Sequence, residues 1–143
     1  MEKTLVLLKP DCVSRALVGT VIKRIEESGL KIVGCKMIQL SAKILAEHYA
    51  HLADKPFFPR IVEFMGSTPV VALVFEGENA VQVLRDVCGA TDSTKAGKGT
   101  IRGDLGKDIQ ENLIHASDSA QAAQVEITRF FSPNEIFAYG KRK

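Results

Sequence analysis

The chain has 143 residues, of which 45% are hydrophobic and 25% are charged. These proportions are typical of a single globular domain, and they exclude a disordered chain, a collagen-like repeat and a long coiled coil. Lysine and arginine number 19 against 17 aspartates and glutamates, so the formal net charge is only +2. Charge alone therefore gives no argument for nucleic acid or a membrane as a partner, although it is compatible with a local basic pocket.

The N-terminal sequence does not resemble a secretory signal, because its apolar run stops at Lys9-Pro10-Asp11 and no cleavage site follows. The longest apolar stretch, Val70–Phe75, suits a buried strand and is far shorter than the ~20 residues of a membrane span. Three widely spaced cysteines (Cys12, Cys35 and Cys88) lack the spacing of a metal site. We therefore expect a cytoplasmic protein with reduced cysteines and no membrane segment.

Apolar periodicity predicts four strands and five helices. The predicted strands cover residues 4–8, 30–40, 70–75 and 113–115. The predicted helices cover about 17–28, 41–52, 59–65, 79–88 and 117–131. We expect Ser41 and Asn79 to be N-caps, Gly29 and Gly89 to end helices, and Gly34 to mark a bulge or a close backbone approach.

The order of these elements favours one α+β architecture. The predicted order is a strand, a helix, a strand, two helices, a strand, a helix, a long loop, a strand and a helix. This order suits a ferredoxin-like sandwich, in which helices cover an antiparallel four-stranded sheet. A doubly wound parallel sheet is the main alternative, because periodicity does not determine strand order. No repeat or linker interrupts residues 1–143, so we expect a single domain.

Residues 89–112 form a long segment without convincing periodicity, and four of the eleven glycines fall between Gly97 and Gly106. Irregular loops longer than ~12–15 residues are uncommon in compact domains and are usually functional or disordered. This segment also carries several cations, namely Lys95, Lys98, Arg102 and Lys107. It is therefore the first candidate for a ligand site. The common phosphate-binding motifs of P-loop, dinucleotide-binding and protein-kinase folds are absent from the sequence.

His115 is the strongest candidate for a nucleophile. It ends a short predicted strand, and small residues follow it. A neutral imidazole is nucleophilic near pH 7 without a separate base, and Glu126 could reach its other nitrogen and determine the tautomer. A core histidine with both nitrogens bonded is an equally good interpretation of the local pattern. Ser117 and Asp118 are typical of helix capping. His48 and His51 suit a surface helix face better than a metal pair.

Other candidates are less specific when taken alone. Lys9 follows a buried strand and could hold a phosphate as a point charge, although an exposed loop lysine is the commoner case. Arg85 and Arg102 could offer planar pairs of donors to phosphate oxygens, but isolated arginines are more often surface charges. Phe57 could be a stacking platform for a base, and the pattern favours a core residue instead.

Eight sequence blocks occur in an order and with a spacing that match one known family across essentially the whole chain. They are Lys9-Pro10-Asp11, His48-Tyr49, Lys55–Phe58, Ser67–Val71, Glu76-Gly77 before Asn79, Gly89–Thr91, Gly99–Arg102 and Asn112–Ser119. Together they resemble the nucleoside diphosphate kinase family, and the last block is highly specific. The resemblance implies a ferredoxin-like sandwich. It also implies an enzyme that transfers the γ-phosphoryl group of a nucleoside triphosphate, mainly ATP, to nucleoside diphosphates and so maintains NTP and dNTP pools.

The resemblance also implies roles for individual residues. Transfer would be ping-pong through a phosphohistidine at His115, oriented by Ser117 and Glu126. Phosphates and ribose would be held by Lys9, Tyr49, Arg85, Thr91, Arg102 and Asn112, of which Lys9 and Tyr49 are also counted as catalytic. Phe57 would stack on the base and tolerate every base, since each has a π-face. Mg²⁺ would be held mainly by the nucleotide phosphates, so no protein metal site is expected.

Three positions depart from the family pattern. Cys12 stands where Gly or Ala is usual, and Ser93 and Lys98 replace prolines in the 89–112 loop. Because proline restricts the backbone, we expect a looser loop. The resemblance implies a homo-oligomer, with a hexamer favoured and a tetramer possible.

Two other functions stay open at this point. One is a ferredoxin-like module that binds RNA or a small regulator. Such a module would need exposed aromatic residues along its sheet, but the chain has only 2 tyrosines and 7 phenylalanines, with no string typical of RNA-binding modules. An inactive structural homologue would have lost motif positions, whereas every position named above is present.

Overall fold

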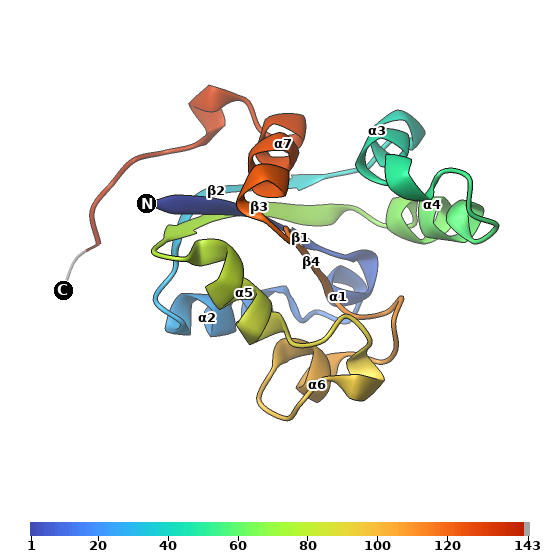
Figure 1. The fold of residues 1–143 in the computed structure, drawn as a ribbon, viewed down its shortest axis with the longest axis horizontal. Coiled ribbons are helices and arrows are strands. Elements are labelled where there is room, and N and C mark those ends of the chain that lie inside the picture. The colour runs from blue at the N-terminus through green and yellow to red at the C-terminus, as the bar shows by residue number, and fades with distance from the viewer. Residues whose placement is uncertain (142–143) are drawn as a thin grey trace.

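The computed structural model describes residues 1–141, and its centre is one four-stranded sheet. The strands are β1 (Glu2–Leu8), β2 (Lys31–Ile38), β3 (Val70–Gly77) and β4 (Ile114–Ala116). They lie in the order β2-β3-β1-β4, and every neighbouring pair is antiparallel. The predicted antiparallel sheet is therefore confirmed, and the parallel alternative is wrong (Figure 1).

Seven α-helices occur within residues 1–141. They are α1 (Pro10–Ser14), α2 (Val18–Glu27), α3 (Ala42–His48), α4 (Phe58–Gly66), α5 (Ala80–Cys88), α6 (Ile101–Leu105) and α7 (Ala120–Phe130). Short 3₁₀ turns cover Ala50–Leu52, Ser93–Lys95 and Pro133–Glu135. The sequence predicted five of the seven helices. It missed α1 and α6 because five residues are too few to show a helical period.

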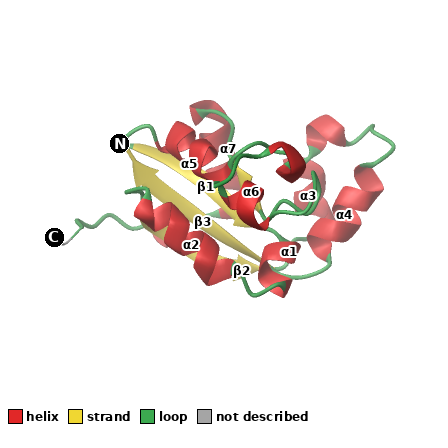
Figure 2. Ribbon diagram, turned by 90° about the horizontal axis from the view of Figure 1, so that it is seen from below, coloured by secondary structure: helices red, strands yellow, loops and turns green. Residues whose placement is uncertain are grey.

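The sheet separates two hydrophobic cores. Along β1, Val6 and Leu8 face one core, while Leu5 and Leu7 face the other. Side chains of α2, α5 and α6 contribute to the first core, and side chains of α3, α4 and α7 contribute to the second. In Figure 1, α2 and α5 lie on one side of the sheet and α7 on the other. Figure 2, seen from below, shows α2 lying over the sheet. Since helices occupy both faces, the described part of the chain offers no open aromatic sheet face for RNA bases.

Local sequence signals explain several element ends. Gly29 and Gly89 follow α2 and α5 with φ of +94° and +84°, a region that glycine enters without a Cβ penalty. Ser41 caps α3 by accepting a 3.2 Å hydrogen bond from the Ile44 amide. The register of β2 against β3 shifts between Ile32 and Gly34, so the predicted bulge is confirmed.

Asn79 occupies the predicted N-cap position of α5, but its side chain does not cap the helix. Asn79 has a φ of +52°, and its side chain makes no capping hydrogen bond. Instead the Glu2 carboxylate accepts a 2.8 Å hydrogen bond from the Val81 amide at the start of α5. A residue from the first strand therefore satisfies this helix end, which local sequence could not reveal.

The 89–112 segment is more ordered than its sequence suggests. It contains the 3₁₀ turn Ser93–Lys95 and helix α6, whose N-cap Thr100 accepts a 3.0 Å hydrogen bond from the Gly103 amide. Of the two residues that stand where the family usually has proline, Ser93 is buried and Lys98 is exposed. In residues 1–141, no helix is long and apolar enough to cross a membrane.

Candidate functional site

His115 lies in the edge strand β4, opposite Leu7 of β1. Leu7 belongs to the core beneath α3, α4 and α7, so His115 points to that same side of the sheet. Its side chain is 23% exposed. The imidazole is thus half-buried against the protein and still open to a ligand.

A carboxylate holds one nitrogen of this ring. Glu126 of α7 lies with its Oε1 2.9 Å from His115 Nε2. Burial alone would raise the pKa of Glu126, but hydrogen bonds from His115 and Ser117 outweigh it and lower that pKa, so the carboxyl stays ionised near neutral pH. An ionised carboxylate only accepts, so Nε2 carries the proton and donates it. The lone pair of the neutral ring is then on Nδ1.

Ser117 supports the same carboxylate. Its hydroxyl donates a 2.7 Å hydrogen bond to Glu126 Oε1, and its oxygen accepts a 3.3 Å hydrogen bond from the Leu5 amide. The alternative that Ser117 caps the following helix is wrong, because Ser119 is the residue whose side chain caps α7. Ser117 is fully buried, so these two contacts determine its orientation.

His48 belongs to this site, contrary to the expected surface position. It is only 6% exposed, and its ring lies edge-on to that of His115 with centroids 4.6 Å apart. Burial, reinforced by His115, lowers the pKa of His48 to about 3. The neutral ring accepts a 2.9 Å hydrogen bond from Arg129 at Nδ1, so its proton is on the buried Nε2. His51 is exposed as expected. We call His48, His115, Ser117 and Glu126 the histidine group.

Tyr49 borders the histidine group. Its ring packs edge-on against His48 with centroids 4.8 Å apart. Burial, together with the charge of Glu126, raises the pKa of Tyr49 to about 12. The phenol is therefore neutral at physiological pH and can donate a hydrogen bond to an anion.

The histidine group is also the place where metal-binding atoms gather. Ligand atoms of His48, His115 and Glu126 all lie within 4.8 Å of one another. Two imidazoles and one carboxylate suit zinc or iron better than Mg²⁺, which prefers oxygen ligands. The carboxylate oxygen is moreover already shared by His115 and Ser117. This set therefore does not fit Mg²⁺.

A second group of polar side chains surrounds the end of β1. Lys9 is 9% exposed, and its ammonium donates to Asn112 Oδ1 at 2.7 Å and to the Gln110 carbonyl at 2.6 Å. The expectation of an exposed loop lysine is wrong. Burial lowers the pKa of Lys9 to about 8; Asp11 opposes this shift and Arg102 adds to it. Because two of its three protons are bonded within the protein, the third is available to a phosphate.

Arg102 is buried as well, although isolated arginines are usually exposed. Its guanidinium donates to the carbonyls of Asn112, Gly89 and Ile114 at 3.4, 3.0 and 2.6 Å. Burial lowers its pKa, and the nearby charge of Arg85 lowers it further. Three of five N–H donors are used here, leaving two for a ligand. We call Lys9, Arg102 and Asn112 the cationic group.

Three predicted residues lie at the surface around these groups. Phe57 is 45% exposed at the start of α4, so the core position favoured by its pattern is wrong. Arg85 and Thr91 are exposed. The Thr91 carbonyl accepts a 2.8 Å hydrogen bond from Asn112 and joins the loop to the cationic group.

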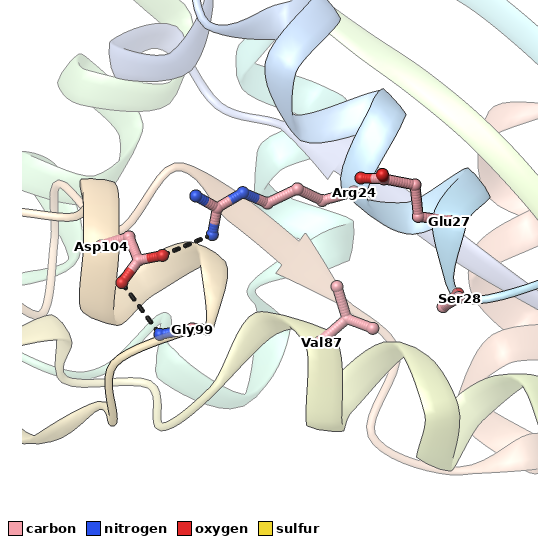
Figure 3. Close-up of a pocket in the computed structure, with 6 residues that line it drawn as sticks. All are labelled: Arg24, Glu27, Ser28, Val87, Gly99 and Asp104. Carbon is pink, nitrogen blue, oxygen red and sulfur yellow. Dashed lines mark hydrogen bonds and ion pairs between the residues drawn. The ribbon is translucent and has the colours of Figure 1, made fainter.

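The structure also contains a cavity of about 490 Å³ away from both groups. Its lining residues, drawn in Figure 3, are Arg24, Glu27, Ser28, Val87, Gly99 and Asp104. Arg24 of α2 bonds Asp104 at 2.8 Å, and Asp104 accepts a 2.9 Å hydrogen bond from the Gly99 amide. Through these two contacts, Asp104 connects the glycine-rich 89–112 segment to α2. We interpret the cavity as part of the scaffold, because it contains none of the predicted site residues.

Comparisons with known proteins agree along nearly the whole chain. The family model of nucleoside diphosphate kinase matches residues 2–136. A nucleoside diphosphate kinase from Parabacteroides distasonis is 50% identical over 139 residues, which cover 97% of this chain and 91% of the relative. One from Archaeoglobus fulgidus is 50% identical over 141 residues, covering 99% and 93%. The solved structure of a Halobacterium salinarum nucleoside diphosphate kinase in complex with CDP is similar with a TM-score of 0.95 at 44% identity, covering 98% and 93%.

Proposed function

Because the chain belongs to the nucleoside diphosphate kinase family of phosphotransferases, we propose that it transfers the γ-phosphoryl group of a nucleoside triphosphate, mainly ATP, to nucleoside diphosphates through a phosphohistidine at His115. The observation that carries this mechanism is the 2.9 Å contact between His115 Nε2 and Glu126. It leaves Nδ1 as the free nucleophilic nitrogen. A core histidine with both nitrogens bonded would have no such atom.

In the first half-reaction, Nδ1 attacks the γ-phosphorus in line. The N–P bond forms as the bond to the bridging oxygen breaks, and the nucleoside diphosphate leaves with that electron pair. The ring becomes cationic, and the carboxylate of Glu126 stabilises the positive charge through Nε2–H. In the second half-reaction, a terminal oxygen of another nucleoside diphosphate attacks the same phosphorus and releases His115 neutral.

Phosphoryl transfer through a loose transition state depends mainly on positioning and on charge stabilisation. Lys9 and Arg102 each keep donors free beside the segment that carries His115, and the exposed Arg85 adds a third cation nearby. We assign phosphate and ribose contacts to Lys9, Arg102 and Asn112 together with Tyr49, Arg85 and Thr91. Ser117 orients Glu126.

Mg²⁺ is assigned to the nucleotide and not to the protein. The histidine group does not fit this ion, for the reasons of ligand chemistry given above. When bound, Mg²⁺ supplies charge neutralisation to the phosphate oxygens. No step of this mechanism requires a protein carboxylate as its ligand.

Phe57 is assigned to the base of the nucleotide. Its side chain is 45% exposed at the start of α4, as a stacking surface requires. Stacking contributes about 1–3 kcal/mol and tolerates every base, so substrates would differ little in their bases. An enzyme with this tolerance can maintain all NTP and dNTP pools. We place the protein in the cytoplasm because its three cysteines are free.

Labelling with γ-³²P-ATP tests the proposal. The wild-type protein is expected to take up a label that is acid-labile and alkali-stable and that transfers to any added nucleoside diphosphate. His115→Ala should take up none. His51→Ala is the matched control, because His51 is exposed and should label normally. A label that persists in His115→Ala contradicts the phosphohistidine.

The subunit number stays a prediction. We propose a homo-oligomer, with a hexamer favoured over a tetramer, on the strength of the family resemblance. Multi-angle light scattering of the purified protein measures the mass directly. A monomer of 15.6 kDa at micromolar concentration would contradict the oligomer.

A further inference from the structure

Leu113 has an unusual backbone conformation two residues before His115. Its φ is +73°, whereas the other non-glycine residues with positive φ in the described chain are Ala16 and Asn79. Leu113 is also fully buried. Leucine has no short polar side chain to stabilise this region, so the conformation is strained and the surroundings must hold it.

The strain belongs to a tight three-residue turn. The Ile114 amide donates a 2.9 Å hydrogen bond to the Asn112 carbonyl, which closes a γ-turn centred on Leu113. Turns of this kind with positive φ are rare and strained. The turn ends where β4 begins, so its shape determines the direction in which β4 presents His115.

Residues from the other end of the chain hold both polar groups of Leu113. The Lys9 amide donates a 2.9 Å hydrogen bond to the Leu113 carbonyl. The Asp11 carboxylate accepts a 3.0 Å hydrogen bond from the Leu113 amide through Oδ2. Arg102 binds the carbonyls on either side of the turn. Lys9 and Arg102 already have roles in the site, but Asp11 has none.

We propose that Asp11 is a positioning residue for His115. Its carboxylate stabilises the strained Leu113 turn, and this turn determines the direction of β4 and hence the position of the His115 ring relative to the phosphate. Asp11 is 4% exposed and therefore cannot meet a nucleotide itself. The inference rests on the proposed function, since it concerns the orientation of the histidine that is phosphorylated. It also explains why the Lys9-Pro10-Asp11 block contains an acid beside a phosphate-binding lysine.

The surroundings of Asp11 agree with this role. Burial raises the pKa of Asp11, while the charge of Lys9 and the hydrogen bond from Leu113 lower it. The hydrogen bond crosses from the first turn of α1 to a residue 102 positions later. The Asp11 carboxylate therefore joins the short helix α1 to the distant Leu113 turn.

The test combines rapid-quench phosphorylation with NMR on the full chain. In Asp11→Ala, the rate constant for phosphorylation of His115 at saturating ATP should fall by about 100-fold, because small misplacements of reacting groups have effects of that size. The Leu113 amide should exchange faster with solvent, and the ring ¹⁵N shifts of His115 should move. Asp11→Asn keeps an acceptor oxygen for the amide and should recover most of the rate.

Leu30→Ala is the matched control. Leu30 is a buried residue that packs beside Gly77, at the end of β3 remote from the turn. It should lower thermal stability and leave the phosphorylation rate constant unchanged. A folded Asp11→Ala with wild-type rate and ring shifts overturns the inference, and so does an Asp11→Asn as slow as Asp11→Ala. Wild-type protein that takes up no label overturns the proposed function instead, and the NMR readouts then still decide whether Asp11 holds the turn.

Discussion

The cationic group and the histidine group are built in opposite ways. Lys9 and Asn112 are 103 residues apart, and both of them, like Arg102, are at most 9% exposed with their polar atoms bonded inside the protein. Three members of the histidine group instead come from the single stretch 115–126, and the His115 side chain is 23% exposed. Distant segments thus form a closed frame, and a local segment presents the reactive ring. Changes to the cationic group should reduce the free energy of unfolding, whereas changes to the histidine group should mainly reduce turnover.

The largest effect is expected from Arg102→Ala. Three carbonyls would each lose a hydrogen bond from the guanidinium, which costs about 1 kcal/mol for each and about 3 kcal/mol in total. Urea unfolding measures this loss, and activity should disappear with it. Arg15→Ala is the control, because Arg15 is exposed and binds one carbonyl, that of Leu105. An Arg102→Ala protein as stable as Arg15→Ala would contradict a stabilising role for the cationic group.

Glu126→Ala should separate turnover from stability. Without the carboxylate, His115 loses the partner that determines its tautomer, and kcat should fall roughly 100-fold, as for other misplaced reacting groups. The free energy of unfolding should change far less than for Arg102→Ala. The kcat of Glu126→Gln, which keeps an acceptor oxygen, should lie between that of the wild type and that of Glu126→Ala. The control is Glu47→Ala, since Glu47 is exposed. Unchanged kcat in Glu126→Ala would remove the basis for activation of the ring.

A smaller effect is expected from pH. The pKa of Lys9 is lowered to about 8 in the folded chain, so Lys9 loses its charge as pH rises through 8. The kcat/KM for a nucleotide should therefore fall above about pH 8, and Lys9→Ala should lack this inflection. The free energy of unfolding should rise between about pH 8 and 10.5, because there the unfolded chain binds more protons than the folded one. Lys98→Ala, at an exposed position, should keep the wild-type profile.

The smallest effect concerns the cysteines. Burial raises the pKa of Cys12 to about 12 and that of Cys88 to about 11. Partial burial also raises the pKa of Cys35, but Cys35 is exposed on the edge strand β2. Iodoacetamide at pH 8 should therefore alkylate Cys35 alone and leave activity unchanged. Mass spectrometry of the native protein identifies the modified residue. Modification of Cys12 under these conditions would show that the first core opens beside the cationic group.

Much of the fold was predictable because it depends on short-range periodicity. The continuous apolar run of β1 and the helical spacing in α2, α5 and α7 are local properties, and the predicted elements were found there. The short helices α1 and α6 were missed because each has five residues. The order of the elements favoured an antiparallel sheet, but periodicity left a parallel sheet open, because strand order depends on long-range pairing.

For the site, the sequence by itself determined the pairing of His115 with Glu126, because a capped helix directly follows the short strand and brings the two within reach. Only the tertiary structure decided burial. Lys9, Arg102 and His48 were expected at the surface and are covered, while Phe57 was expected inside and is half exposed. Burial depends on which distant segment packs on a residue, and in this chain segments about 100 residues apart do so. A local pattern has no access to such contacts.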